Sequence, residues 1–215
     1  MSAKTVLCFG DSNTHGSMPV KHRGFKDRYP DDQRWPSVMG QRLGPGWTVI
    51  NEGQPGRTTV LDDPIEGPHK NGSRALPILL ETHRPIDFVI IMLGTNDLKR
   101  RFSIGAYEIA QGVEKLIVST RAAAAGPNGG FPQLLVATPT PVVETGPLAE
   151  PYAGAQDESK RLAETFVAMG ERANVEVIDL DPVAKVSLVD GIHFEPDALA
   201  SIGHAVADKV IEMTA

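Results

Sequence analysis

Five short apolar runs alternate with segments of helical periodicity along the chain, and this alternation restricts the possible folds more than any other feature. The most hydrophobic run is rich in β-branched side chains, which predicts a buried central strand. Strands separated by helices at this spacing predict an α/β fold with a parallel sheet covered by helices on both faces. The predicted strands are Val6–Phe9, Trp47–Ile50, Asp87–Leu93, Leu134–Ala137 and Val175–Asp179.

Apolar residues at three- and four-residue steps predict the helices between these strands. The clearest example places Ile109, Val113 and Leu116 on one buried face. The predicted helices cover residues 36–43, 74–83, 106–120 and 162–173, and a last helix opens at 195–197. Three stretches have neither the helical nor the strand period and are predicted to be loops that wall a site: residues 17–36, 54–73 and 138–154.

Length and charge limit the classes of protein and partner. A chain of 215 residues with 41% hydrophobic content can bury one sizeable core, so one domain over residues 1–215 is expected. The net charge of -6 argues against nucleic acid as a partner. No run reaches membrane-spanning length and no signal-peptide core is present, which predicts a cytoplasmic protein without a membrane partner. The proline-rich loops are equally consistent with contacts in a homo-oligomer and with solvated lids, so the sequence leaves both interpretations open.

Small and polar residues follow three of the predicted strands, where the carboxyl ends of parallel strands bring them to one edge of the sheet. Further along, Asp190 and His193 are three residues apart, so the carboxylate can bind one imidazole nitrogen and leave the other free. A serine hydroxyl needs such an oriented base to become a nucleophile. Ser12 carries the candidate hydroxyl. The polar segments that follow the three strands are predicted turns: Gly10-Asp11-Ser12, Asn51-Glu52-Gly53 and Gly94-Thr95-Asn96-Asp97.

In order along the chain, these three turns and Asp190-Gly191-Ile192-His193 resemble the four conserved blocks of the SGNH (GDSL-type) hydrolases. The chain is most similar to the short bacterial arylesterase and acyltransferase group. The resemblance implies a three-layer α/β/α flavodoxin-like sandwich with a five-stranded parallel sheet. It also implies a catalytic triad of Ser12, His193 and Asp190, and an oxyanion hole formed by the backbone N–H groups of Ser12 and Gly53 and the side-chain amide of Asn96.

Two positions depart from the family pattern. Asn13 stands where leucine is usual, and Pro55 stands where serine is common. Neither position carries a catalytic role in the family, but both lie in turns that form the site.

The residues favour a cofactor-free serine esterase that hydrolyses short-chain acyl esters of small molecules through an acyl-enzyme. The resemblance adds acyl transfer to alcohols or peroxide, provided that the pocket disfavours water. Candidate pocket residues near the turns are Asp11, His15, Trp35, Pro55, Thr95 and Ile192, and the loops add Phe25, Tyr29, Val142 and Tyr152.

Other interpretations stay open at this point. Ser12 also suits a helix N-cap, and the chain would then be a flavodoxin-like module that binds a small anion. A carbohydrate deacetylase or a thioesterase would use the same residues as an arylesterase. Asp11 and Asp97 are more typical of turn or cap residues than of a second base.

Several enzyme classes are disfavoured. Cys8 lies inside an apolar strand, which is typical of a packed core residue rather than a thiol nucleophile. No histidine pair has the spacing of a zinc motif, which argues against a metal hydrolase. The Gly-x-Ser-x-Gly elbow and the dinucleotide fingerprint are both missing, which argues against an ordinary α/β-hydrolase and an NAD enzyme.

Overall fold

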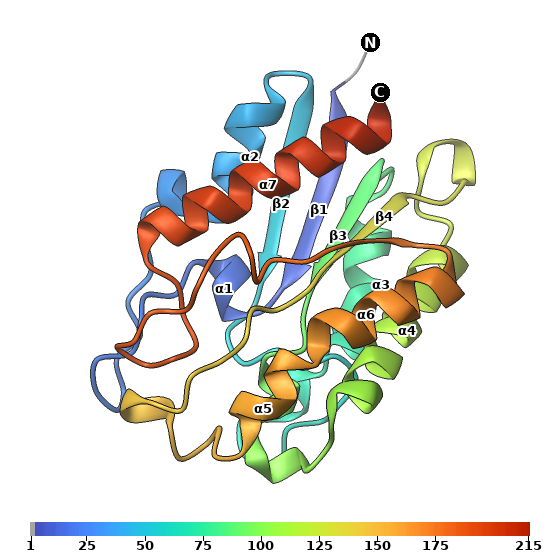
Figure 1. Ribbon diagram of the computed structural model, residues 1–215. Helices are drawn as coiled ribbons and strands as arrows, with labels where there is room; N and C mark the ends of the chain where they lie inside the picture. The colour runs from blue at the N-terminus through green and yellow to red at the C-terminus, as the bar shows by residue number, and fades with distance from the viewer. Residues whose placement is uncertain (1–2) are drawn as a thin grey trace.

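The computed structural model describes residues 3–215 and is built around a five-stranded parallel sheet in the order β2-β1-β3-β4-β5 (Figure 1). The predicted fold class is confirmed. From β1 the chain moves outward to β2 and then crosses to β3 on the other side, and ligand sites of open α/β sheets form at such a reversal. The strands are β1 (Lys4–Gly10), β2 (Trp47–Gly53), β3 (Phe88–Met92), β4 (Gln133–Ala137) and β5 (Glu176–Ile178).

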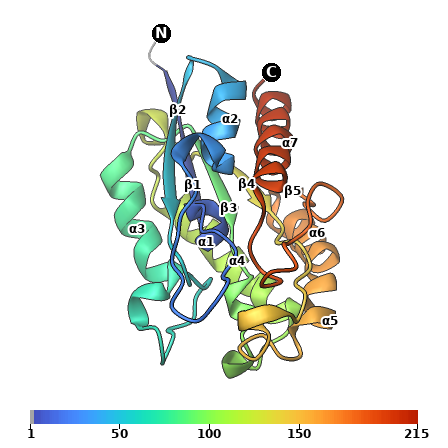
Figure 2. The ribbon, with the colours of Figure 1, turned by 90° about the vertical axis from the view of Figure 1, so that its left-hand side faces the viewer.

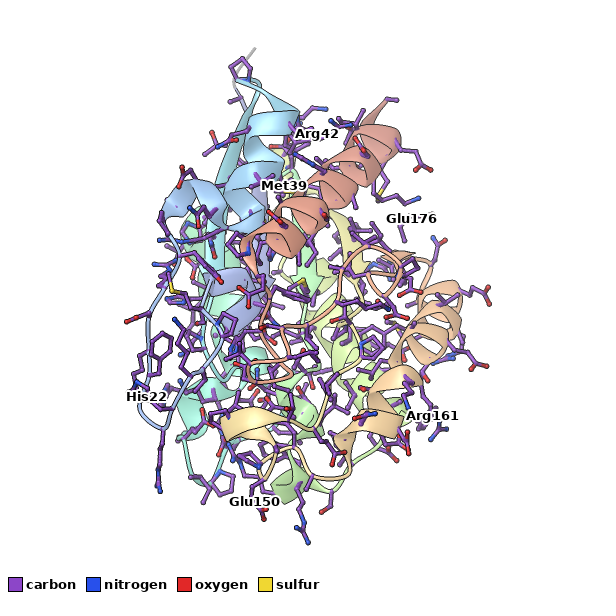
Figure 3. The ribbon with its side chains drawn as sticks, turned by 60° about the vertical axis from the view of Figure 1, so that its left-hand side comes forward. His22, Met39, Arg42, Glu150, Arg161 and Glu176 are labelled. Atoms are coloured by element: carbon purple, nitrogen blue, oxygen red, sulfur yellow. The ribbon has the colours of Figure 1, made fainter. Side chains whose placement is uncertain are left out.

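Helices cover both faces of the sheet, and Figure 2 shows α3 on one side of the strands with α2 and α7 on the other. The five predicted helices are all present, and each bound that was predicted lies within two residues of the observed one: α2 (Trp35–Leu43), α3 (Gly72–His83), α4 (Ala106–Ala122), α6 (Leu162–Ala173) and α7 (Pro196–Thr214). On the α2 and α7 face, Arg42 forms an ion pair of 2.5 Å with Asp208 (Figure 3).

Two short helices were not expected from the sequence: α1 (Ser12–His15) and α5 (Ala155–Lys160). Each is too short to show an apolar period, and α5 is mostly polar. Single 3₁₀ turns complete the loops: η1 (Asp31–Gln33), η2 (Pro68–Lys70), η3 (Asn96–Leu98), η4 (Arg100–Phe102), η5 (Pro127–Gly129) and η6 (Gly146–Leu148).

The alternation of side chains along β1 divides the core into two apolar layers. Leu7 and Phe9 pack on the side of α3, α4 and α6, whereas Val6 and Cys8 pack on the side of α2 and α7. Cys8 is fully buried, and burial raises the pKa of its thiol. It is therefore the core residue that the sequence predicts, since a neutral buried thiol is a poor nucleophile.

The carboxyl ends of the strands and the three long loops share one end of the molecule. In Figure 3, His22 and Glu150 mark two of these loops at the end opposite to Arg42. The start of β1 and the end of α7 lie at the other end (Figure 1), where Lys4 and Ala215 border the same surface hollow. Within residues 3–215, no helix is both long and apolar enough to cross a membrane.

Candidate active site

Ser12 is the first residue of α1, directly after the carboxyl end of β1. The N-cap of this helix is Asp11, whose carboxylate accepts a hydrogen bond of 2.9 Å from the backbone N–H of Asn13. The interpretation of Ser12 as a helix cap is therefore wrong, and the capping role expected for Asp11 is confirmed. The turn requires glycine at position 10, because a Cβ there would lie 2.0 Å from the Thr14 hydroxyl.

The Ser12 hydroxyl meets His193, which lies 181 residues further along the chain. The distance from Ser12 Oγ to His193 Nε2 is 3.0 Å, and that from His193 Nδ1 to Asp190 Oδ2 is 2.6 Å. A carboxylate only accepts hydrogen bonds, so its contact assigns the proton to Nδ1 and leaves Nε2 as the acceptor for the serine hydroxyl. The three side chains are nearly inaccessible to solvent. The arrangement can remove a proton from Ser12.

The loop around Asp190 holds its carboxylate in place. Oδ1 accepts from the backbone N–H groups of Ile192 and His193 at 2.9 and 3.0 Å, and Oδ2 also accepts from Val20 N–H at 2.6 Å. Burial raises the pKa of Asp190, but the hydrogen bonds and charge of His193, together with the bond from Val20, outweigh burial and hold the pKa below its usual value. Asp190 is therefore ionised at neutral pH and fixes the orientation of the imidazole.

Asn96, in η3, presents its side-chain amide to the β1–α1 turn. Its Nδ2 donates to Asp11 Oδ2 at 3.3 Å, and its Oδ1 accepts from the Tyr152 hydroxyl at 3.2 Å. Because the amide oxygen is held by Tyr152, the nitrogen side of the group must face the turn. Asn96 borders the same cavity as Ser12, and within residues 3–215 its amide nitrogen has Asp11 as its acceptor for one of two N–H bonds.

Gly53 does not fit the oxyanion role that the resemblance implies. Its N–H donates to Asn51 Oδ1 at 3.0 Å, and a Cβ at this position would lie 2.1 Å from the backbone nitrogen of His15. Gly53 therefore packs behind α1 instead of facing the cavity. Three residues later in the same turn, Gly56 borders the cavity with Ser12, and its N–H has no acceptor within residues 3–215.

Two buried carboxylates, those of Asp97 and Asp11, hold the turns at this edge of the sheet. Asp97 accepts from Thr59 N–H at 3.0 Å and from its hydroxyl at 2.5 Å, which ties η3 to the loop after β2. Burial raises the pKa of Asp97 to about 7 and that of Asp11 to about 6. Asp97 holds loops together and does not contact Ser12 or His193, as its expected structural role requires.

The titration of Asp97 is expected to make the protein less stable as pH rises from about 4 to about 7. Its folded pKa lies above the unfolded value, so its contribution is fully present below the unfolded pKa and is lost as pH rises through the folded pKa. The slope for one such group reaches about 1.4 kcal/mol per pH unit. The titration of His15 has the opposite effect on stability over this pH range, because burial lowers the pKa of His15 to about 4.

The test therefore measures the free energy of unfolding in urea for the wild type and for Asp97→Asn at several pH values across this range, and compares the two pH dependences. The wild type should lose more free energy of unfolding than the variant, since His15 and Asp11 titrate in both. Equal pH slopes for the two proteins would contradict the assignment.

Next to Ser12 lies a cavity of about 740 Å³, a size typical of small-molecule sites. Of the candidate pocket residues, His15, Pro55 and Ile192 border it, as do Phe25 and Tyr152. Trp35 does not, because it is fully buried and donates its indole N–H to Thr14 Oγ1. The other candidates that lie outside the cavity wall are Asp11 and Thr95, which are buried in the turns, Tyr29, which bonds Glu195, and Val142, which packs in the core.

One wall of the cavity is charged, which the sequence analysis missed. The buried Lys99 ammonium lies 2.6 Å from Glu66, and Arg101 binds the same carboxylate at 2.7 Å. Their positions in polar loops gave no period that could have indicated a shared wall. The residues that border the cavity without having been predicted include Met18, Val20, Lys26, Asp27, Gly56, Glu66, Lys70, Lys99, Arg101, Leu148 and Pro151.

The chain is similar to known proteins in both sequence and structure. The GDSL-like lipase/acylhydrolase family model matches residues 8–198. A carbohydrate acetylesterase from Sinorhizobium meliloti is 40% identical, with a TM-score of 0.92 over 98% of this chain and 99% of that one. An aryl esterase from M. smegmatis is 37% identical, with a TM-score of 0.93 over 98% of this chain and 99% of that one. A search of curated proteins found no match.

Proposed function

This chain belongs to the GDSL-like lipase/acylhydrolase family, and on that premise we propose that it cleaves short-chain acyl esters through Ser12, His193 and Asp190, as an arylesterase-type enzyme. The family and the esterase neighbours make the chain an ester-hydrolysing serine hydrolase, so the non-catalytic anion-binding module is rejected. The observation that carries the proposal is the unbroken hydrogen-bonded chain from Ser12 Oγ through His193 to Asp190.

In the proposed reaction, His193 Nε2 takes the proton of Ser12 as Oγ attacks the ester carbonyl carbon. The carbonyl oxygen becomes an oxyanion in the tetrahedral intermediate. Collapse breaks the bond to the alcohol, and His193 returns the proton to that leaving group. Water then attacks the acyl-enzyme with the same proton transfers in reverse, which releases the acid and restores Ser12.

Three donors are proposed for the oxyanion: the backbone N–H of Ser12, the side-chain amide of Asn96 and the backbone N–H of Gly56. Ser12 N–H is at the start of α1 and has no intrahelical acceptor. Gly56 replaces Gly53 in this set because its N–H is free of protein acceptors in residues 3–215 and it borders the cavity. Preorganised donors of this kind stabilise the charge that develops in the transition state.

Replacing Asn96 with alanine is expected to lower kcat by about 10²- to 10³-fold with a much smaller change in KM. The donor acts on the oxyanion more than on the ground-state carbonyl. Tyr152→Phe should shift kcat in the same direction by a smaller factor, because it frees the amide to rotate while leaving it present. Steady-state kinetics with a nitrophenyl acetate measure kcat and KM for both variants. An unchanged kcat for Asn96→Ala would show that Asn96 does not stabilise the oxyanion.

The size and lining of the cavity support a small acyl ester as substrate. Phe25, Pro55 and Tyr152 give part of the cavity an apolar surface on which an aromatic alcohol can pack. The same apolar surface supports acyl transfer to an alcohol in competition with hydrolysis. Comparison of ester formation with hydrolysis in dilute aqueous alcohol tests this step, and a purely hydrolytic product would reject it.

A carbohydrate acetyl ester is the second candidate, favoured by the charged wall. Lys70, Glu66 and Arg101 present hydrogen-bonding groups to the cavity, as a sugar alcohol requires. The similarity to the Sinorhizobium meliloti carbohydrate acetylesterase supports the same class.

A panel of substrates separates these candidates. It combines nitrophenyl esters of increasing acyl length, a phenyl thioester and a peracetylated sugar, and compares kcat/KM. The arylesterase proposal expects the largest value for the short nitrophenyl esters. A higher value for the acetylated sugar would replace it with the carbohydrate esterase, and a higher value for the thioester would replace it with a thioesterase.

A further inference from the structure

Asn13, the residue after Ser12, links the nucleophile directly to the loop that carries His193. Its buried side chain donates from Nδ2 to the backbone carbonyl of Ile192 at 3.1 Å. Ile192 immediately precedes His193, so this bond and the bond between Ser12 and His193 join the same two segments at neighbouring residues. The relative position of α1 and the histidine loop is therefore held at two points.

The other end of the Asn13 amide is buried without a protein partner. Neither Asn13 Oδ1 nor the hydroxyl of Thr140 has a hydrogen-bond partner anywhere in the described chain, although both are shielded from solvent. Flipping the amide would not help, because Oδ1 would then face the Ile192 carbonyl oxygen. Buried polar groups of native proteins are almost always satisfied, by protein or by ordered water.

Asn13 and Thr140 border the same small internal cavity. Its space for the centre of a water molecule is about 10 Å³, close to what a single water requires. Thr95 and Ile192 also border it, so the cavity lies between the turns that carry Asn96 and His193. It is polar on the sides of Asn13 and Thr140, which distinguishes it from the dry apolar voids of protein cores.

We propose that this cavity binds one ordered water molecule bridging Asn13 Oδ1 and Thr140 Oγ1, and that Asn13 is a positioning residue for the Ser12–His193 pair. The water donates one hydrogen bond to the amide oxygen of Asn13 and forms a second hydrogen bond with the hydroxyl of Thr140. The bond from Asn13 to Ile192 holds α1 against the loop that carries His193. The water holds α1 against the loop that follows β4. A leucine side chain at this position would make none of these bonds. The kinetic part of this inference rests on the proposed function.

A high-resolution crystal structure of the wild-type protein tests the water directly. We expect a water within hydrogen-bond distance of both Asn13 Oδ1 and Thr140 Oγ1, and a dry cavity would overturn the proposal. This readout does not depend on activity, so it stays valid if the protein fails to hydrolyse esters.

Asn13→Leu tests the positioning role. We expect kcat per active site, counted by organophosphate titration of Ser12, to fall about tenfold on a nitrophenyl acetate while KM changes less than about twofold, because small misplacements of reacting groups lower the rate of the chemical step. The downfield proton resonance of His193 Nδ1–H should broaden or shift. Loss of thermal stability with unchanged kcat and an unchanged resonance would show that Asn13 is only structural.

Thr140→Val keeps the bond from Asn13 to Ile192 and removes only the water's second partner, so it remains informative if Asn13→Leu does not fold. It should lose the water and lower kcat about threefold. The matched control is Thr120→Val, which deletes a buried hydroxyl bonded to Leu116 within α4 and should leave kcat unchanged. Equal kcat values for the two threonine variants would contradict the proposal.

Discussion

Replacing Ser12 with alanine is expected to lower kcat by about 10⁶-fold, the largest effect of any single change in this chain. The substitution removes the Oγ that is proposed to form the acyl-enzyme, and His193 Nε2 loses its hydroxyl partner. The remaining oxyanion donors and the cavity leave a small residual rate over water. Hydrolysis of a nitrophenyl acetate measures the loss.

Labelling provides an independent measurement. An organophosphate should add its mass to the peptide that contains Ser12 in the wild type and fail to do so in Ser12→Ala. The control is Ser201→Ala, an exposed serine of α7, which should retain both activity and labelling. Retained hydrolysis by Ser12→Ala, or a label on another residue, would contradict the assignment of the nucleophile.

Asp190→Asn is expected to lower kcat by about 10⁴-fold with little loss of folded protein. An asparagine amide would present an N–H to His193 Nδ1 and favour the tautomer whose proton is on Nε2. That tautomer cannot accept the proton of Ser12. The wild-type carboxylate favours the opposite tautomer, because hydrogen bonds hold the pKa of Asp190 below its usual value and keep it ionised at neutral pH.

A double variant tests whether the two residues act together. Ser12→Ala combined with Asp190→Asn should be no slower than Ser12→Ala alone, because residues of one catalytic unit are not additive. The matched control is Asp208→Asn, which removes an exposed carboxylate of α7 paired with Arg42 and should leave kcat unchanged. Independent, multiplying losses would show that Asp190 acts elsewhere than through His193.

The sheet and the long helices could be predicted because each leaves a repeating apolar pattern. The run through Ile90 is buried on both faces, and α4 shows its inner face at Ile109 and Val113. Helix α1 could not be predicted, since four residues contain no period. It is held by the local cap at Asp11 and by a tertiary contact, the close approach of Gly53 to its backbone.

The meeting of Ser12, His193 and Asp190 was anticipated because strand ends and a short Asp–His spacing are visible in sequence. The direction in which a turn presents its N–H groups is not visible, so Gly53 was chosen where Gly56 borders the cavity. Trp35 was placed in the pocket because loop aromatics often line sites, but its indole is fully buried and bonded to Thr14. The ion pairs of Lys99 and Arg101 with Glu66 depend on loop paths that no local pattern encodes.

The separation of 181 residues between the serine and its base has a consequence for biosynthesis. A nascent chain exposes the nucleophile's strand first, but it has no base until the segment around His193 has left the ribosome. On the proposed mechanism, a partial chain that lacks this segment has no base to activate Ser12 and forms no acyl-enzyme.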